Sequence, residues 1–412
     1  MDEGALNALG EERLDWRFKA IPPSAHGMTV AEYTAARPPL SDFGTPLLTL
    51  DAGALDHNVR VLADWTGRAG VLLAPHGKTT MAPQLWRRQL DAGAWGITLA
   101  NLPQLRVARA FGVRRLMLAN AVTDLAGLAW LAGELDHDPH FEFVTWADSV
   151  RTVELMDRAL RSARAQRAMG VCVELGGPDG RTGARGDDEA AAVAEAVAKA
   201  PTLDLVGVAG YEGAFVHDAA AGSLATVDAY LKRLAALFER LDYATDRPIV
   251  TAGGSAYFDQ VAGVLGGLDA QVVLRSGAYV IHDDGFYREV SPLARGAGVA
   301  LASAMHGWGR VTSSPEPGLA LLDTGKRDLP FDEGMPEPQL IRGKGPVERG
   351  RVTKVMDQHT FLVDSGAEIG DVVRLGLSHP CTAMDKWALI PVVDDADAAD
   401  PVVVDLVRTW FG

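Results

Sequence analysis

The chain has 412 residues, which is too long for one ordinary hydrophobic core, so we expect two domains, with a barrel as one option for the larger. A hydrophobic content of 48% and a charged content of 23% are typical of a globular protein, and the net charge of −15 argues against nucleic acid as a partner. No run of about 18 apolar residues is present, so the sequence predicts no membrane span. Only two cysteines occur and the N-terminus lacks the features of a signal peptide, so we expect a cytoplasmic protein without a disulfide framework.

Residues 1–45 precede any regular alternation of elements. They contain two Pro-Pro breaks, and Glu11–Lys19 is the one stretch with helical character. A strand is expected at residues 45–51 and an amphipathic helix at residues 54–69.

Between residues 71 and 275, apolar runs of strand length alternate with helical segments. The eight expected strands are residues 71–74, 96–100, 116–119, 141–145, 170–175, 203–208, 248–252 and 271–275. The helices expected between them are residues 83–92, 103–111, 125–135, 149–164, 187–200, 224–241 and 255–265. This alternation predicts a (β/α)₈ barrel of the TIM type, with an open doubly wound sheet as the alternative. The runs are continuously apolar, which is typical of strands covered on both faces.

After about residue 295, short strands with Gly and Pro turns replace the helical periodicity. They are expected at residues 298–305, 318–323, 351–355, 360–363, 371–375 and 387–392. The predicted fold is therefore α/β, with a barrel followed by a C-terminal all-β domain. We expect three parts: an N-terminal extension that packs on the β domain, the barrel, and the β-rich domain, at residues 1–45, 46–293 and 294–412.

Lys78 stands directly after the first expected barrel strand. Desolvation at such a position favours the neutral amine, which is the nucleophile that a Schiff base requires. The alternative is a structural lysine whose amine extends to water. His76 lies two residues earlier, so both side chains point the same way on an extended backbone. It is a candidate acid–base partner or a hydrogen-bonded structural histidine.

The seventh and eighth expected strands both end in turns of small residues. Barrels of this type hold phosphate at these two strand ends, where glycine N–H groups and a helix N-terminus favour an anion. Each turn alone fits an ordinary loop, but together they favour a phosphate site. A phosphate site opposite a lysine that ends strand one indicates pyridoxal 5′-phosphate. The residues concerned are Gly253, Gly254 and Ser255 after strand seven, and Arg275, Ser276, Gly277 and Tyr279 at the end of strand eight and just after it.

Three further features lie at predicted loops. Arg181, in a glycine-rich loop after strand five, is a candidate partner of the pyridoxal phenolate or a surface arginine. Tyr211, after strand six, is a candidate cofactor or substrate contact or a core tyrosine. His379 and Cys381 would share one face of an extended chain, and imidazole with thiolate suits zinc, although such a pair also arises by coincidence. Two protein ligands leave coordination positions open, as in catalytic metal sites.

The chain resembles the D-serine dehydratase and D-threonine aldolase family, the metal-dependent branch of the alanine-racemase-like (fold type III) pyridoxal phosphate enzymes. The resemblance covers roughly residues 45–395 and leaves residues 1–45 and 329–350 outside its motifs. The motifs that carry it are Pro75-His76-Gly77-Lys78-Thr79, Tyr211-Glu212-Gly213, Gly253-Gly254-Ser255, Arg275-Ser276-Gly277-Ala278-Tyr279 and His379-Pro380-Cys381.

The resemblance implies roles for these residues. Lys78 would be the Schiff-base lysine, and His379 with Cys381 would bind a divalent metal, with zinc expected and manganese or magnesium as alternatives. Residues 253–255 and 276–277 would hold the phosphate. It also implies a homodimer in which each active site lies near the partner's β domain.

Within the resembling family, dehydratases carry Cys at the second metal position and D-threonine aldolases typically carry Asp. Cys381 therefore favours elimination of water from D-serine-like or D-threonine-like substrates, giving a 2-oxo acid and ammonia. The first alternative is retro-aldol cleavage to glycine and an aldehyde. Amino-acid racemisation and a non-enzymatic pyridoxal-phosphate-binding protein are more distant alternatives, and the latter would not need the β domain.

Overall fold

The computed structural model describes residues 1–411, and the chain divides into two compact units. The barrel unit consists mainly of residues 63–78 and 89–277. The antiparallel unit consists of residues 2–62, residues 79–88 and the chain from Ala278 onward. No helix within residues 1–411 has the length and apolar character needed to span a bilayer.

Eight parallel strands form the sheet of the barrel unit, in the order β2-β9-β8-β7-β6-β5-β4-β3. The sheet closes because Trp95 N–H donates to Leu73 O (2.7 Å) and Thr98 N–H donates to Pro75 O (2.9 Å), next to a parallel bridge between His76 and Thr98. The predicted barrel is confirmed, and the open doubly wound alternative is wrong. The strands are β2 Leu72–Leu73, β3 Ile97–Leu99, β4 Arg115–Leu118, β5 Glu142–Ala147, β6 Met169–Leu175, β7 Leu203–Gly210, β8 Ile249–Ala252 and β9 Gln271–Leu274.

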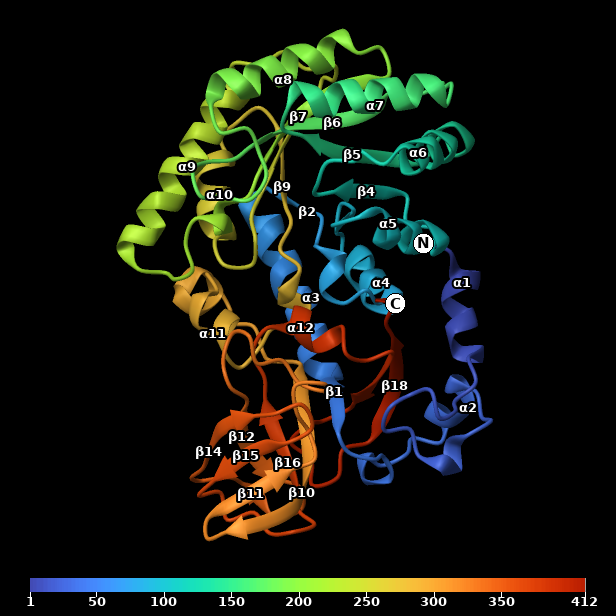
Figure 1. The fold of residues 1–412 in the computed structure, drawn as a ribbon, viewed down its shortest axis with the longest axis vertical. Helices are drawn as coiled ribbons and strands as arrows, with labels where there is room; N and C mark the ends of the chain where they lie inside the picture. Colours follow the sequence, from blue (N-terminus) through green and yellow to red (C-terminus); the bar gives the residue numbers. More distant parts are fainter. Residues whose placement is uncertain (412) are drawn as a thin grey trace. The chain divides into compact units, whose positions relative to one another are not determined.

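A helix follows each barrel strand from β3 to β8 and lies outside the sheet (Figure 1). In α7, for example, Val153, Met156 and Leu160 are buried at helical spacing, so one face packs inward. Side-chain caps begin several of these helices, as where Ser149 Oγ accepts from Thr152 N–H. The helices that follow β3 to β8 are α5 Leu102–Ala110, α6 Leu125–His137, α7 Val150–Ser162, α8 Asp187–Lys199, α9 Ala221–Glu239 and α10 Phe258–Leu265. α3 Ala52–Ala69 and α4 Pro83–Asp91 precede and follow β2 in the chain, and most of their residues group with the antiparallel unit.

The antiparallel unit is built on a sheet with the order β13-β12-β16-β10-β1-β17-β18. β11 extends it from β10, and β15 and β14 follow β11. Short helices α11 Phe286–Val290 and α12 Pro380–Met384 belong to the same unit. The strands are β1 Leu47–Asp51, β10 Met305–Glu316, β11 Leu319–Leu322, β12 Glu337–Ile341, β13 Gly345–Pro346, β14 Arg351–Val355, β15 Thr360–Val363, β16 Val372–Gly376, β17 Leu389–Val393 and β18 Val403–Arg408.

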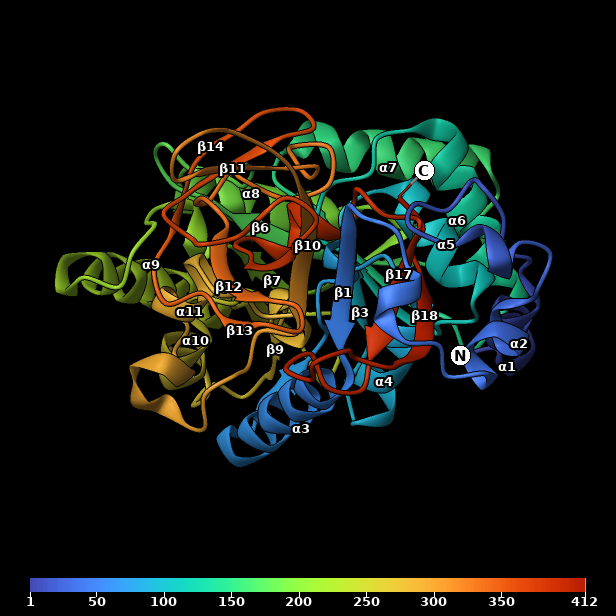
Figure 2. The ribbon, with the colours of Figure 1, turned by 90° about the horizontal axis from the view of Figure 1, so that it is seen from below.

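β1 pairs with β10 and β17 in this sheet (Figure 2), whereas the expected range 46–293 placed it with the barrel. The strand expected at residues 298–305 is wrong, because the ladder begins only at Met305. Gly307 lowers the strand propensity of β10, yet a Cβ there would lie 2.6 Å from Leu329 Cδ2, so the packing requires glycine. β12, β13 and β18 were not expected.

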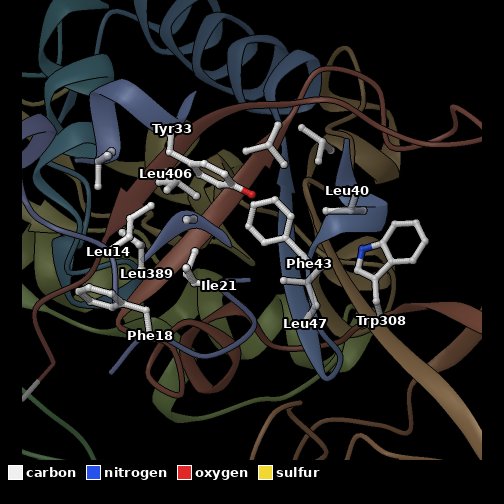
Figure 3. Close-up of a cluster of buried hydrophobic side chains, with 14 of the residues drawn as sticks. Leu14, Phe18, Ile21, Tyr33, Leu40, Phe43, Leu47, Trp308, Leu389 and Leu406 are labelled. Atoms are coloured by element: carbon white, nitrogen blue, oxygen red, sulfur yellow. The ribbon is translucent and has the colours of Figure 1, made fainter. Parts of the chain in front are cut away.

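Residues before β1 pack into the antiparallel unit (Figure 3). Helices α1 Glu3–Asn7 and α2 Val30–Ala35 are short. The helix expected at Glu11–Lys19 is wrong: Leu14 N–H instead donates to Met28 O (2.9 Å). The side chains of Leu14 and Phe18 instead enter the apolar cluster from irregular backbone. The cluster consists of Leu14, Phe18, Ile21, Ala25, Val30, Tyr33, Leu40, Phe43, Leu47, Trp308, Val372, Leu389, Val393, Ala396, Val403 and Leu406.

Candidate active site and metal ligands

Lys78 lies at the carboxyl end of β2, half-buried, in the 3₁₀ turn η4 (Gly77–Thr79). The chain just before it runs beside the end of β9, where His76 N–H donates to Arg275 O (3.2 Å). A Cβ on Gly277 would lie 2.4 Å from His76 O, so only glycine permits this close approach. The structure therefore brings Lys78, His76 and the Ser276–Gly277 turn to the same end of the barrel, as expected for a TIM-type active site.

His76 is held as a neutral imidazole. Burial lowers the pKa of His76 well below its usual range, and the charges of Lys78, Arg275 and Arg181 lower it further, against a hydrogen bond with Thr98. Its Nδ1 atom is buried and has no hydrogen-bond partner within residues 1–411. A buried polar atom without a partner at the mouth of a barrel is a place for a ligand contact. The low pKa makes His76 a weak base, so a hydrogen-bonding role fits better than proton abstraction.

The sequence predicted that the N–H groups of the turn after β8 bind an anion, but two of them already have another partner. Gly253 adopts a left-handed conformation (φ +91°), which suits glycine. Gly253 N–H donates to Glu212 Oε2 (3.0 Å) and Gly254 N–H donates to Glu212 Oε1 (2.7 Å). Ser276 Oγ donates to the carbonyls of both glycines, at 3.2 and 3.1 Å. The two N–H groups predicted for the phosphate are therefore bound to a carboxylate.

Arg275 points into the barrel and is 7% exposed. Its Nη1 donates to Thr251 Oγ1 (2.7 Å) and its Nη2 donates to Gly210 O (2.6 Å). Burial lowers the pKa of Arg275, and the carboxylates of Glu212 and Glu174 oppose that shift. These two acidic residues, at the ends of β7 and β6, were not selected from the sequence, because only the packed barrel places them beside Arg275.

Arg181 and Tyr211 lie together. The guanidinium of Arg181 sits 4.2 Å from the centre of the Tyr211 ring, a cation–π contact. The Tyr211 ring also packs against Gly254, where a Cβ would lie 3.0 Å from Tyr211 Cε2. Ser255 is partly exposed at the start of the segment that leads to α10. Tyr279 is buried in the 3₁₀ turn η6 (Ala278–Val280), which groups with the antiparallel unit.

His379 stands at the start of α12 and Cys381 lies within it, so the expected extended conformation is wrong. His379 caps α12 with left-handed backbone (φ +65°), and Cys381 is already helical. The peptide N–H of His379 donates to Asp283 Oδ2 (2.8 Å), which holds this unusual conformation. The two side chains are nevertheless hydrogen-bonded to each other, and Cys381 Sγ lies 3.4 Å from Thr79 Oγ1.

A carboxylate supports the imidazole of His379. His379 Nδ1 lies 2.6 Å from Asp332 Oδ2, and Thr382 Oγ1 donates to Asp332 Oδ1 (2.7 Å). Burial disfavours the His379 charge, but Cys381 and Asp332 outweigh it and raise the pKa of His379 to about 9. An imidazole bonded to carboxylate through Nδ1 presents Nε2 to a metal ion, the usual arrangement in metalloproteins. Asp332 lies 47 residues from His379 in the sequence, and no local signal pointed to it.

The donor set fits a divalent metal with two protein ligands and open positions. Within residues 1–411, no group of three or more His, Cys, Asp or Glu residues is arranged to hold a metal ion. Imidazole plus thiol thus remains the candidate set, with Asp332 behind it rather than in it.

Comparisons with known proteins cover nearly the whole chain. A family model described as "Alanine racemase, N-terminal domain" matches residues 50–264, more than half of the chain. A second, described as "Putative serine dehydratase domain", matches residues 304–393. A D-threonine aldolase of Arthrobacter sp. is 29% identical over 370 residues, covering 88% of this chain and 92% of that protein.

Solved structures agree on the fold. The D-threonine aldolase of Filomicrobium marinum has a TM-score of 0.76 at 25% identity, covering 90% of this chain and 96% of that one. A D-threo-3-hydroxyaspartate dehydratase of Delftia sp. HT23 has a TM-score of 0.70 at 20% identity, covering 90% and 98%. A dehydratase of that name has also been solved in a metal-free form.

Proposed function

Because this chain belongs to the alanine-racemase-like family that includes the D-threonine aldolases and D-serine dehydratase-like proteins, we propose that it is a pyridoxal-phosphate- and metal-dependent lyase of D-β-hydroxy amino acids. The proposed reaction eliminates water from a D-serine-like or D-threonine-like substrate and yields a 2-oxo acid and ammonia. The observation that carries the proposal is the His379–Cys381 pair, in which Asp332 supports His379. The same chain has Lys78 in the turn that follows barrel strand β2.

The residues at the barrel mouth fit pyridoxal phosphate. Lys78 would bind the aldehyde carbon, and after substrate binding its freed amine would take the proton from the substrate Cα. Bound pyridoxal phosphate supplies an electron sink for the negative charge that develops at Cα. His76, kept neutral, would offer its buried Nδ1 for a hydrogen bond, and Arg181 stacked on Tyr211 would place a fixed positive charge.

His379 and Cys381 would hold the metal through Nε2 and Sγ, and zinc suits this soft pair better than manganese or magnesium. A divalent ion at this position supplies Lewis acidity for the departing hydroxyl group. Asp332 would fix the ring orientation of His379. Thr79, whose hydroxyl lies 3.4 Å from Cys381 Sγ, follows Lys78 directly in the sequence. We further propose a homodimer, in line with the family resemblance, and a cytoplasmic location, in line with the low cysteine content.

Aldol cleavage to glycine and an aldehyde is the second candidate. The observation that favours it is the 29% identity to a D-threonine aldolase over most of both chains. Cys381 argues the other way, because the resembling aldolases typically carry Asp at that position.

Product analysis tests the choice. The purified protein, loaded with pyridoxal phosphate and zinc, is incubated with D-serine, D-threonine and their L-enantiomers. Formation of pyruvate or 2-oxobutyrate with equal ammonia supports elimination, whereas glycine with acetaldehyde supports aldol cleavage. Interconversion of D- and L-serine without either product would indicate a racemase. Stable cofactor binding without turnover of any of the four would indicate a pyridoxal-phosphate-binding protein.

A further inference from the structure

The Gly253–Gly254 turn after β8 has a carboxylate on its N–H side. Glu212, in the turn after β7, is completely buried, and its two oxygens accept one hydrogen bond each from Gly253 N–H (3.0 Å) and Gly254 N–H (2.7 Å). Charge-assisted hydrogen bonds of this kind are among the stronger ones in proteins.

The carbonyl side of the same turn is also bound. Arg275 N–H donates to Gly253 O (3.0 Å), and Ser276 Oγ lies 3.2 Å from Gly253 O and 3.1 Å from Gly254 O. Every backbone polar group of the two glycines therefore has a partner. These bonds tie the turn after β8 to the turn after β9, the two turns at which barrels of this type hold phosphate.

A cation compensates the buried charge of Glu212. The guanidinium of Arg275 is attracted to the Glu212 carboxylate and is itself fixed by Thr251 and Gly210. A buried carboxylate is tolerated when hydrogen bonds and an opposite charge surround it, as here. A phosphate group that took the same two N–H groups would have to displace this carboxylate or lie against it, and like charges at that distance repel strongly.

We propose that Glu212 is a positioning residue for the phosphate of the cofactor, resting on the proposed function in which that cofactor is pyridoxal phosphate. Glu212 fixes the shape of the Gly253–Gly254 turn by accepting hydrogen bonds from the N–H groups of both glycines. The phosphate monoester binds to other donors of the turns after β8 and β9. The N–H groups of Gly253 and Gly254 then make no phosphate contact. The glycines serve packing, because a Cβ on Gly253 would lie 2.7 Å from Leu274 Cδ2.

The test compares two ligands that differ only in the phosphate. Cofactor-free protein and its Glu212→Gln variant are titrated with pyridoxal phosphate and with pyridoxal, and binding is followed by absorbance. The glutamine keeps the volume of the side chain but offers one oxygen, so one glycine N–H faces an NH₂ group. Affinity for pyridoxal phosphate should fall about ten- to hundredfold, while affinity for pyridoxal stays unchanged.

Glu174→Gln is the matched control, because Glu174 is the other buried carboxyl beside Arg275 but accepts its hydrogen bond from Thr182 instead of from the turn. In that variant, the ratio of the two affinities should stay at the wild-type value. An unchanged affinity of Glu212→Gln for pyridoxal phosphate would overturn the proposal, because Glu212 would then have no effect on phosphate binding. An increased affinity would overturn it too, because Glu212 would then compete with the phosphate. An equal loss for both ligands would also overturn it.

A second measurement does not require a variant. In wild-type protein labelled with ¹⁵N-glycine, inorganic phosphate should shift the amide signal of Gly277 more than those of Gly253 and Gly254. The reverse order would contradict the proposal. If wild-type protein binds neither aldehyde, the proposed function and this inference fall together. If it binds both and only the Glu212 result fails, the proposed function stands.

Discussion

The two units hold their polar groups in different ways. In the barrel, Glu212 is 0% exposed and Arg275 is 7% exposed, and hydrogen bonds from several strand ends fix both. In the antiparallel unit, the side chain of His379 is 22% exposed and that of its partner Asp332 is 41% exposed. The Glu212–Arg275 pair is thus buried and bonded on several sides, whereas the candidate metal ligand His379 and its partner Asp332 are partly exposed to solvent.

This difference predicts that loss of the metal will not remove the cofactor from the barrel. Fixed internal hydrogen bonds favour a cofactor that stays bound, while partly exposed ligands permit exchange of an ion with solvent. Each of the following experiments either separates the two sites further or shows that the separation is wrong.

Lys78→Ala should have the largest effect. Without this amine the barrel has no nucleophile at the end of β2, so covalent attachment of pyridoxal phosphate should disappear and turnover should fall by about 10³-fold or more. Borohydride reduction followed by mass analysis measures the adduct. Lys199→Ala, which removes an exposed helix lysine paired with Glu195, is the control and should keep it. A reducible adduct in Lys78→Ala would refute the assignment.

Loss of the metal should leave the barrel site intact. Chelation, or Cys381→Ala, should lower elimination about a hundredfold or more while the absorbance of bound cofactor persists, and added zinc should restore the chelated wild type. Cys381→Asp should retain a metal but prefer manganese over zinc. Cys172→Ala removes the other cysteine, which lies buried in β6, and should respond to zinc like the wild type. Full activity after exhaustive chelation would contradict a catalytic metal.

Asp332→Asn should weaken the metal site by a smaller amount. The amide cannot accept the Nδ1–H hydrogen bond with the strength of a carboxylate, so affinity for zinc should fall about ten- to hundredfold. Competition with a chromophoric chelator measures this affinity directly. Asp385→Asn, at the C-terminal end of α12, should leave the affinity unchanged. Equal affinities of Asp332→Asn and wild type would remove Asp332 from the metal site.

The smallest expected effect is on the pH dependence of stability and comes from His306. Its measurement tests whether the antiparallel unit also has a buried polar group that stays uncharged. Burial, together with Arg374, lowers the pKa of His306 to about 3, against the opposing charge of Asp397. Below the unfolded pKa of about 6.5 the unfolded chain binds a proton that the folded chain does not, so stability falls as the pH falls from about 6.5 towards 3. The slope from this one residue is at most about 1.4 kcal/mol per pH unit.

His306→Gln should remove that contribution. Between pH 7 and pH 5, the thermal midpoint of the variant should decrease by a few degrees less than that of the wild type. The comparison is made within each protein, so a change in stability at pH 7 does not affect it. Identical decreases would show that His306 is protonated in the folded state.

The barrel could be predicted from sequence because its strands are continuously apolar, and its candidate site residues were selected because they follow strand ends. Lys78 and Ser276 could be selected as candidates from their positions at strand ends alone. Glu212 stood inside a recognised motif, but its bonds to Gly253 and Gly254 depend on the packing of three strand ends, which no local pattern reveals. Asp332 and Asp283 reach His379 from 47 and 96 residues away, and their positions depend on the fold of a whole unit.

The antiparallel unit was harder to predict for the same reason. β10 contains Gly307 and Gly309, which weaken its strand signal although the packing requires them. β1 reads as a strand, but nothing in its sequence indicates that its neighbours begin more than 250 residues later.

That separation has a consequence for synthesis on the ribosome. β1 ends at Asp51, and its partner β10 begins only at Met305, so the chain between them must be added before the pair can form. At about 5–20 residues per second this takes roughly 13–50 s, during which the apolar side chains of residues 14–47 have no sheet to cover. The nascent chain is therefore exposed to chaperones and to aggregation from its first segment, while the strands of the barrel are already available to fold. Translation speed and chaperone supply should accordingly govern the yield of this protein more than its final stability does.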